Sequence, residues 1–359
     1  MAENTGNIRV TQKDIARIAG VSHVTVSLSL RNRREIPVVT RQRIHEIAEK
    51  IGYSPDPMLK ALSAYRLKQR PAAFQANLAW LINHHDPNQL FYFEDFRLYF
   101  QGAKTRAAEL GYGVEIFNLV DYDYNGKAIQ KVLKARGIEG ILVSPVENYR
   151  DHINLDWSRY SAVRFGYSMK DTVLHTVTNS QYRSAFVATE NLKRLGYRKI
   201  GCMIGDDFNE RTGGHFLGGF LSARAHLMLE DIPPCMIDEV ILPEANEQYW
   251  DQPRAWLIKH QPDAILAHAS YFASFLQKWG YRVPEDIGFA SLSLEEESAG
   301  SSGIHQNPRK VGRAAVDLLV ALIERLETGI PDTPMHVLIE GVWRDGQTTL
   351  FRHVDNLVK

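Results

Sequence analysis

Hydrophobic residues recur at two different spacings along this chain of 359 residues. In roughly the first 50 residues they return every three or four positions, which is typical of amphipathic helices. This pattern predicts three short helices capped at their N-termini by Thr11, Ser22 and Thr40, with Ile18 on the buried face of the first. Only residues 19–21 separate the first two helices, so we expect a sharp turn between them.

From residue 77 onward, short apolar runs alternate with helical patterns. The predicted strands are 77–83, 113–118, 138–143, 161–166, 199–204, 237–241, 263–268, 286–292 and 335–341. The predicted helices are 94–110, 126–136, 181–195, 214–230, 247–260, 270–279 and 308–327. Such alternation predicts α/β architecture with parallel sheets, and its length favours two lobes. Ligands of parallel sheets bind at the carboxyl ends of the strands, here facing a cleft between the lobes.

The boundaries between these patterns predict four segments. An all-α helix-turn-helix head occupies 8–56. A short hinge helix at 57–66 and a linker at 67–75 follow it, and the two-lobed domain takes 76–359. A helix as short as the hinge is marginal by itself in water, so it needs a partner to stay folded.

The net charge of zero conceals an asymmetry. Residues 1–70 carry 13 Lys and Arg against 6 Asp and Glu, a net +7, and the rest carry 29 against 36, a net −7. A basic end suggests a polyanion partner, although a solvated basic surface explains the charge equally well. No apolar run approaches the ~18 residues of a membrane helix, and the start lacks the apolar core of a signal peptide. We therefore expect a cytoplasmic protein with no membrane partner.

The second helix has the features of a DNA-reading helix. If Val26 and Leu30 face the core, the outward positions are His23, Val24, Ser27 and Leu28. An α-helix fits the major groove, where side chains near its N-terminus reach base edges. Ser22, Thr25 and Arg31 suit phosphate contacts, and we add Thr11 and Gln12 from the start of the first helix. A protein-interaction module of three helices remains the alternative.

Residues 10–27 resemble the LacI/GalR (lactose-repressor) family of bacterial regulators. The family pattern is Val-Thr-x-x-Asp-(Val/Ile)-Ala-x-x-Ala-Gly-Val-Ser-x-x-Thr-Val-Ser, and it matches without a gap. The similarity extends through 40–41 and 51–55. It continues more weakly but collinearly at 188–200, 282–287 and 304–312.

The resemblance implies a transcriptional repressor that binds a pseudo-palindromic double-stranded DNA operator as a homodimer. It implies a ligand-sensing and dimerisation domain like the periplasmic binding proteins, switched by a small-molecule effector. It also implies that two hinge helices pair over the minor groove, with Leu62 wedged between base steps and Lys60 beside it. Packing of Leu62 against the sensor domain is the alternative.

The sequence departs from the family at positions that determine specificity. Leu28 stands where relatives often carry Arg or His, and leucine cannot donate to guanine. Ser180, Phe216 and Ser293 stand where relatives grip an effector with charged groups. Without those groups we expect an uncharged, saccharide-like effector that stacks on aromatic rings. The alternative is that these aromatic residues belong to the hydrophobic core, as such residues more often do. The candidate effector residues are His84, Ser180, Phe216, Trp250, Tyr271 and Ser293.

Other chemistry finds little support in the sequence. Cys202 and Cys235 form no metal-ligand or disulfide pattern and are expected in the core. No catalytic motif is present, so we expect no enzyme activity, no cofactor and no metal. Two other functions remain open: a DNA-binding regulator without a small effector, and a sugar-binding receptor or enzyme built on the two-lobed domain.

Overall fold

The computed structural model describes most of the chain. The described residues are 10–30, 36–53, 74–84, 94–146, 153–237, 250–268, 272–296 and 300–352. The predicted hinge helix, with Lys60 and Leu62, lies outside them, as do Arg31 and Tyr271.

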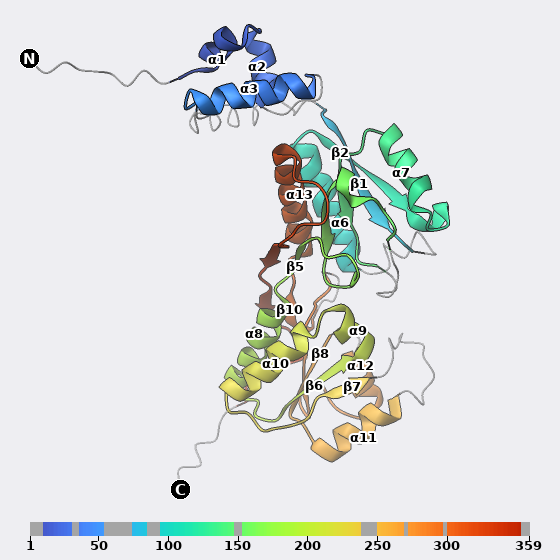
Figure 1. Ribbon diagram of the computed structural model, residues 1–359. Helices are drawn as coiled ribbons and strands as arrows, with labels where there is room; N and C mark the ends of the chain where they lie inside the picture. Colours follow the sequence, from blue (N-terminus) through green and yellow to red (C-terminus); the bar gives the residue numbers. More distant parts are fainter. Residues whose placement is uncertain are drawn as a thin grey trace, which may run out of the picture.

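Three helices form the N-terminal head (Figure 1). They are α1 (Gln12–Ala19), α2 (His23–Leu30) and α3 (Val38–Lys50). Their apolar faces meet in a small core made of Ile15, Ala16, Ala19, Val26, Ile44 and Ala48. The three predicted helices are therefore present, and each buries one face against the other two.

Two of the three predicted caps are confirmed. At α1 the carboxylate of Asp14 accepts hydrogen bonds from the backbone N–H of Thr11, at 2.9 Å, and from its hydroxyl, at 2.7 Å. At α2 the backbone N–H of Thr25 donates to Ser22 Oγ at 3.0 Å. Each bond provides a partner for a polar group at a helix start, where the helix itself offers none.

Two details of the head differ from the prediction. Helix α3 has Pro37 as its N-cap, so Thr40 lies inside the first turn and does not cap it. Proline was overlooked because it has no side-chain acceptor, although it suits a helix start where no N–H partner is needed. The side chain of Ile18 is 47% exposed, so it does not belong to the core.

The first lobe is built on a six-stranded parallel sheet in the order β11-β5-β4-β3-β1-β2. Its strands are β1 (Ala76–Ile82), β2 (Tyr112–Asn118), β3 (Gly140–Val143), β4 (Ser161–Phe165), β5 (His175–Asn179) and β11 (His336–Ile339). Helices α6 (Glu94–Glu109) and α13 (Pro308–Arg325) pack on one face. The other face is covered by α7 (Gly126–Ala135), with the short 3-10 helices η1 (Leu119–Tyr122) and η2 (Trp157–Arg159).

The second lobe repeats this plan with the order β12-β10-β9-β8-β6-β7, in which only β12 is antiparallel to its neighbour. Its strands are β6 (Ile200–Gly205), β7 (Cys235–Ile237), β8 (Ala264–Ala267), β9 (Gly288–Ser291), β10 (Ser302–His305) and β12 (Val342–Arg344). Helices α8 (Gln181–Arg194) and α10 (His215–His226) cover one face. Helices α11 (Asp251–His260) and α12 (Phe272–Lys278) cover the other, and α9 (Asp206–Arg211) follows β6.

The chain passes between the lobes three times: at 180, at 306–307 and at 340–341. The buried side chain of Gln306, in the second passage, is hydrogen-bonded to residues on both sides of the first. Its carbonyl oxygen accepts from Asn179 Nδ2 at 2.8 Å and from Ser184 Oγ at 3.0 Å, while its amide nitrogen donates to the carbonyl of Leu292. A buried amide whose bonds are satisfied restrains the crossing strands to one arrangement.

The prediction of two lobes of alternating strands and helices is confirmed. It missed β5, β10 and β12, and also α9. The residues of β5 and β10 are mainly polar or glycine, so neither strand carries the apolar run by which buried strands were identified. The observed β7 ends at Ile237, where the predicted strand begins.

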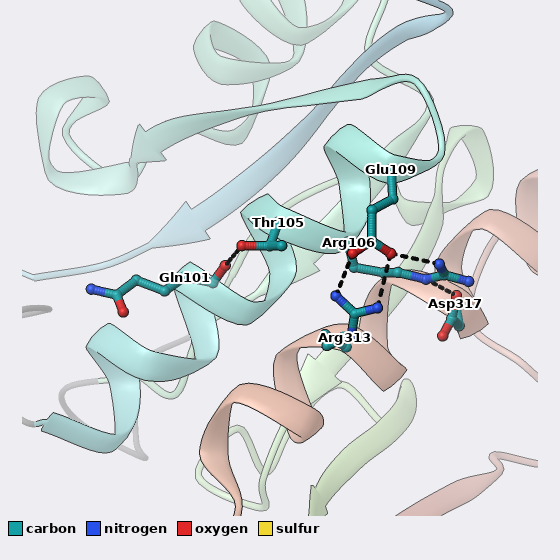
Figure 2. Close-up of polar contacts among 6 residues, drawn as sticks. All are labelled: Gln101, Thr105, Arg106, Glu109, Arg313 and Asp317. Atoms are coloured by element: carbon teal, nitrogen blue, oxygen red, sulfur yellow. Dashed lines mark hydrogen bonds and ion pairs between the residues drawn. The ribbon is translucent and has the colours of Figure 1, made fainter. Parts of the chain in front are cut away.

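Helices α6 and α13 are in unusually close contact. A Cβ atom added to Gly312 would lie 2.0 Å from the carbonyl oxygen of Tyr99, and one added to Gly102 would lie 2.1 Å from that of Arg309. At the outer edge Glu109 accepts two hydrogen bonds of 2.8 Å from Arg313 (Figure 2). Two small residues thus allow the backbones to approach, and ion pairs line the edge.

Figure 2 shows that this ionic network continues along both helices. Arg106 donates to Glu109 at 2.8 Å and to Asp317 at 2.6 Å. Hydrogen bonds from Arg313 and then Arg106 lower the pKa of Glu109 to about 2. Because these groups are solvent-exposed, we assign most of the stability of the contact to packing and little to charge.

We expect Gly312→Ala to reduce the free energy of unfolding by about 1–3 kcal/mol, because an added methyl group must push two backbones apart. Chemical denaturation followed by circular dichroism measures this. Gly218→Ala is the matched control, since a Cβ there meets nothing within 4 Å and alanine favours a helix by up to ~1 kcal/mol. Equal effects from both substitutions would contradict a steric requirement at Gly312.

Candidate DNA-binding face and interlobe site

Helix α2 turns one face inward and one outward. Val26 is fully buried, whereas the side chain of Val24 is 64% exposed and His23 is also exposed. Ser27 and Leu28 are half-buried. The structure therefore places the four predicted base-reading residues on the part of α2 that the head leaves accessible, with Leu28 less exposed than Val24.

The predicted phosphate contacts at the helix starts already take part in local hydrogen bonds. The hydroxyls of Ser22 and Thr25 lie 2.8 Å apart, so one hydroxyl proton of the pair is used between them and the other remains for a phosphate. Thr11 donates its hydroxyl proton to Asp14. Gln12 Nε2 donates to Tyr53 Oη at 3.1 Å and so ties α1 to the residue that follows α3.

The two lobes are in contact at Ser293, which follows the carboxyl end of β9. Its hydroxyl donates to Asp95 Oδ2 at 2.9 Å, and Asp95 lies in the first turn of α6 in the opposite lobe. Beside this bond the backbone N–H of Glu296 donates to Glu94 Oε2 at 2.7 Å. Ser293 is thus a residue of the lobe interface, and Asp95 is its partner.

Burial raises the pKa of Asp95 to about 6. The hydrogen bond from Ser293 opposes this effect, while the charges of Glu94 and Glu295 add to it. Carboxylates therefore gather at this side of the interface. Arg97 and Arg309 pair with Glu94 and Glu296, so the net charge here is small, and a ligand with hydroxyl groups could donate to the carboxylates.

The candidate aromatic residues lie mainly inside the second lobe. Phe216 is buried and stacks on Phe208, with ring centroids 5.6 Å apart. Phe208 is only half-buried and stacks on His268 at 4.5 Å. Burial lowers the pKa of His268 to about 4, so this imidazole is neutral at physiological pH. Trp250 is buried and stacks on Phe275 at 3.9 Å within the hydrophobic core.

The two remaining candidates are buried at strand ends of the first lobe. His84 follows β1, and its carbonyl oxygen accepts a hydrogen bond of 2.8 Å from Asn118. Ser180 lies in the first crossing between the lobes, where its backbone N–H donates to Ile339. The structure thus brings Ser293 to the opposite lobe, whereas Phe216 and Trp250 are held within the second.

Further contacts bridge the lobes at the loop after β4. Lys170 Nζ lies 2.6 Å from Glu210 Oε2 of α9, and Arg211 donates to the carbonyl of Val146 at 2.9 Å. The Tyr167 ring packs against His215, the first residue of α10. The lobes are therefore joined directly at two places besides the three crossings.

The described residues contain neither a candidate metal cluster nor a disulfide. Within the described ranges no group of three or more His, Cys, Asp or Glu could hold a metal ion. Cys202 and Cys235 are free and buried, as expected, and burial raises the pKa of each thiol to about 12. In the same part of the chain no helix is long and apolar enough to cross a bilayer.

Two family models match the chain in the order of its domains. Residues 11–56 match the bacterial regulatory proteins of the lacI family, and residues 189–349 match a periplasmic binding protein-like domain. The chain thus carries a lacI-family DNA-binding domain followed by a periplasmic binding protein-like domain. The resemblance predicted from residues 10–27 is therefore confirmed, together with the fold of a helix-turn-helix head and a two-lobed α/β domain.

Curated relatives align along most of the length of this chain. The HTH-type transcriptional repressor PurR of Haemophilus influenzae (strain PittEE) is 23% identical over 333 residues, which are 89% of this chain and 93% of the relative. PurR of Aliivibrio salmonicida (strain LFI1238) is 23% identical over 340 residues, covering 88% and 92%. These relatives are regulators rather than enzymes.

Solved structures share the fold. A transcriptional regulator CelR–cellobiose complex superimposes with a TM-score of 0.61 and 18% identity, covering 95% of this chain and 100% of that one. The Lac repressor dimer bound to operator and the anti-inducer ONPF gives a TM-score of 0.58 and 18% identity, covering 95% and 99%.

We expect Asp95→Asn to change how stability depends on pH. A carboxyl whose pKa is raised from 3.8 to about 6 favours the folded state below pH 3.8 and loses that contribution as pH rises through 6. The variant should therefore gain up to about 3 kcal/mol relative to the native chain between pH 4 and 7. Denaturation across that range measures it, with Asp121→Asn on the surface as control. A difference that does not vary with pH would show that Asp95 is not desolvated.

Proposed function

We propose that this LacI-family chain is a transcriptional repressor that inserts α2 into the major groove of a pseudo-palindromic operator as a homodimer. A small effector bound between its lobes switches operator affinity. The observation that carries the proposal is the exposed face of α2, with Val24 and His23 outward and Val26 buried, on a head that matches the lacI family. The basic charge of residues 1–70 supports a DNA partner.

The names of similar proteins support the dimer and the effector. The Lac repressor structure is a dimer on operator, and the CelR structure holds cellobiose. By analogy we assign DNA contacts to the candidates on α1 and α2 and to Arg31, and minor-groove contacts to Lys60 and Leu62. We retain the boundaries 8–56, 57–66, 67–75 and 76–359 for head, hinge, linker and sensor. DNA as partner also supports a cytoplasmic protein without catalytic activity.

We propose an uncharged, hydroxyl-rich effector of the saccharide type. The carboxylates near Asp95 support this because they accept hydrogen bonds from hydroxyl groups. Phe208 adds a half-exposed ring next to Phe216, which stands where relatives carry arginine. Ser293 and Asp95 would exchange their mutual bond for bonds to the effector, and His84, Ser180, Trp250 and Tyr271 would shape the surroundings.

A regulator without a small effector is the second candidate. The direct bond from Ser293 to Asp95 and the ion pair of Lys170 with Glu210 favour it, because they join the lobes without any ligand. On that alternative the two-lobed domain serves dimerisation alone.

Selection of bound duplexes from a random DNA pool tests the main proposal. We expect a pseudo-palindromic site whose affinity falls about 10³-fold or more when salt is raised fourfold, as for proteins that neutralise many phosphates. Repeating the binding with cellobiose and ribose as probes tests the effector. Recovery of no common sequence would overturn specific DNA binding, whereas a shift only with phosphorylated sugars would overturn the uncharged effector.

We expect Leu28→Arg to change which base is preferred at one position of each half-site. Arginine can make a bidentate contact with guanine worth about 1–3 kcal/mol, whereas leucine offers only an apolar surface for a thymine methyl. The full chain is compared on half-sites that differ at single bases. Val39→Arg, at a position 76% exposed on α3, is the control that adds the same charge away from α2. If Leu28→Arg only strengthens binding to every sequence equally, as the control does, Leu28 does not face the bases.

A further inference from the structure

Three polar residues form a row across the edge of the first-lobe sheet. Arg164 of β4 is paired in register with Thr176 of β5, and Thr176 with His336 of β11. Residues paired in this way project from the same face of a sheet. The opposite face carries the neighbours that pack against α6 and α13, namely Val163, Phe165, Val177 and Val337. The row therefore lies on the face away from α6 and α13, next to the loop after β4.

Arg164 is buried, with 6% of its surface exposed, and its hydrogen-bond acceptors among the described residues are neutral. Its Nε donates to Thr176 Oγ1 at 2.9 Å, and its Nη1 donates to the carbonyls of Met169 and, at 3.3 Å, Thr172. No carboxylate of the described residues lies within 4.0 Å of the Arg164 guanidinium, so none forms an ion pair with it. No described residue accepts a hydrogen bond from Arg164 Nη2. A buried cation is unfavourable unless a counter-charge or strong acceptors accompany it, and the described residues supply no carboxylate.

Further donors converge on the same place from both lobes. The ring of Tyr167 lies 4.5 Å from that of His215 and 5.6 Å from that of His336. His215 opens the twelve-residue helix α10, whose N-cap Gly214 provides no side-chain acceptor, so the partial positive charge of the helix start adds to the site. Burial, and then the charges of Arg164 and His215, lower the pKa of His336. The groups that influence one another here are thus basic or neutral.

We propose that this chain binds a small oxyanion, a phosphate or carboxylate group, between Arg164 and His336, beneath Tyr167 and the start of α10. The free Nη2 of Arg164 provides two N–H donors in the planar geometry that suits such a group. His336 is exposed and forms the entrance. Because His215 and Tyr167 come from different lobes, the bound anion stabilises the arrangement in which these lobes touch.

This site is separate from Ser293 and Asp95, where carboxylates gather, and it does not depend on the proposed repressor function. The alternative is a structural role, in which the hydrogen bonds from Arg164 to the carbonyls of Met169 and Thr172 hold the loop after β4 in place. That structural role needs only neutral donors and leaves the positive charge unexplained. The test must therefore measure a response to anions rather than stability alone.

Thermal unfolding of the full chain in increasing inorganic phosphate, at constant ionic strength set with sodium chloride, provides that response. A ligand that binds only the folded state raises Tm as its concentration exceeds Kd, by about 5 °C or more at a hundred-fold excess. We expect this rise in the native chain and its loss in Arg164→Met. Arg136→Met, at an exposed arginine paired with Glu115, should keep the rise. Absence of any rise with phosphate or acetate in the native chain, or its persistence in Arg164→Met, would overturn the proposal.

A second variant keeps the test decisive if Arg164→Met fails to fold. His336→Gln alters an exposed side chain and should fold normally while weakening the phosphate response several-fold, whereas His260→Gln should not. An unchanged response in His336→Gln would also refute the site as assigned. Parallel titrations with acetate distinguish a carboxylate site from a phosphate site. The anion that raises Tm at the lower concentration is the one that the site prefers. Operator binding by the same variants remains a separate measurement, so failure here leaves the repressor proposal intact.

Discussion

The arrangement of this molecule depends on the buried amide of Gln306, which joins the first two places where the chain crosses between its lobes. Its carbonyl oxygen accepts from Asn179 and Ser184, and its nitrogen donates to Leu292, so residues from distant parts of the sequence share one hydrogen-bonded junction. Because the second crossing leads into α13 and the third leaves β11, the C-terminal part of the chain completes the first lobe. Neither lobe is a continuous piece of sequence, and any rotation between them must act on this junction.

Two electrostatic features border the interface between the lobes, and they have opposite character. Around Asp95 and Ser293 carboxylates come together, and burial raises the pKa of Asp95 to about 6. Around Arg164 and His336 the groups are basic, and burial lowers the pKa of both. A ligand that bears hydroxyl groups suits the first place and an oxyanion the second. Each would change the free energy of the arrangement in which the lobes touch, and so would influence the head through the segment that joins them.

The sequence allowed the elements with regular patterns to be predicted well. The recurrence of hydrophobic residues every three or four positions predicted the three helices of the head, and glycines with positive φ end several of the observed helices. At Gly196, for example, Tyr197 N–H bonds back to Leu192, as a glycine-capped helix requires. Strands β5 and β10 were not predicted because their residues are mainly polar or small and form no apolar run. Both strands are nevertheless buried, because other elements cover both faces of a parallel sheet.

The sequence by itself determined the family, the order of head and sensor, and the face of α2 turned outward, because each follows from local spacing or from a gapless motif. The resemblance to the family also singled out Ser293, which stands at an effector position of relatives. Only the tertiary structure decided that Asp95 is the partner of Ser293, that Phe216 and Trp250 are core residues, and that Arg164 lacks a carboxylate among the described residues. These facts depend on contacts between residues up to about two hundred positions apart. No local pattern encodes which distant side chain will fill a buried site, because burial and charge pairing are properties of the assembled layers.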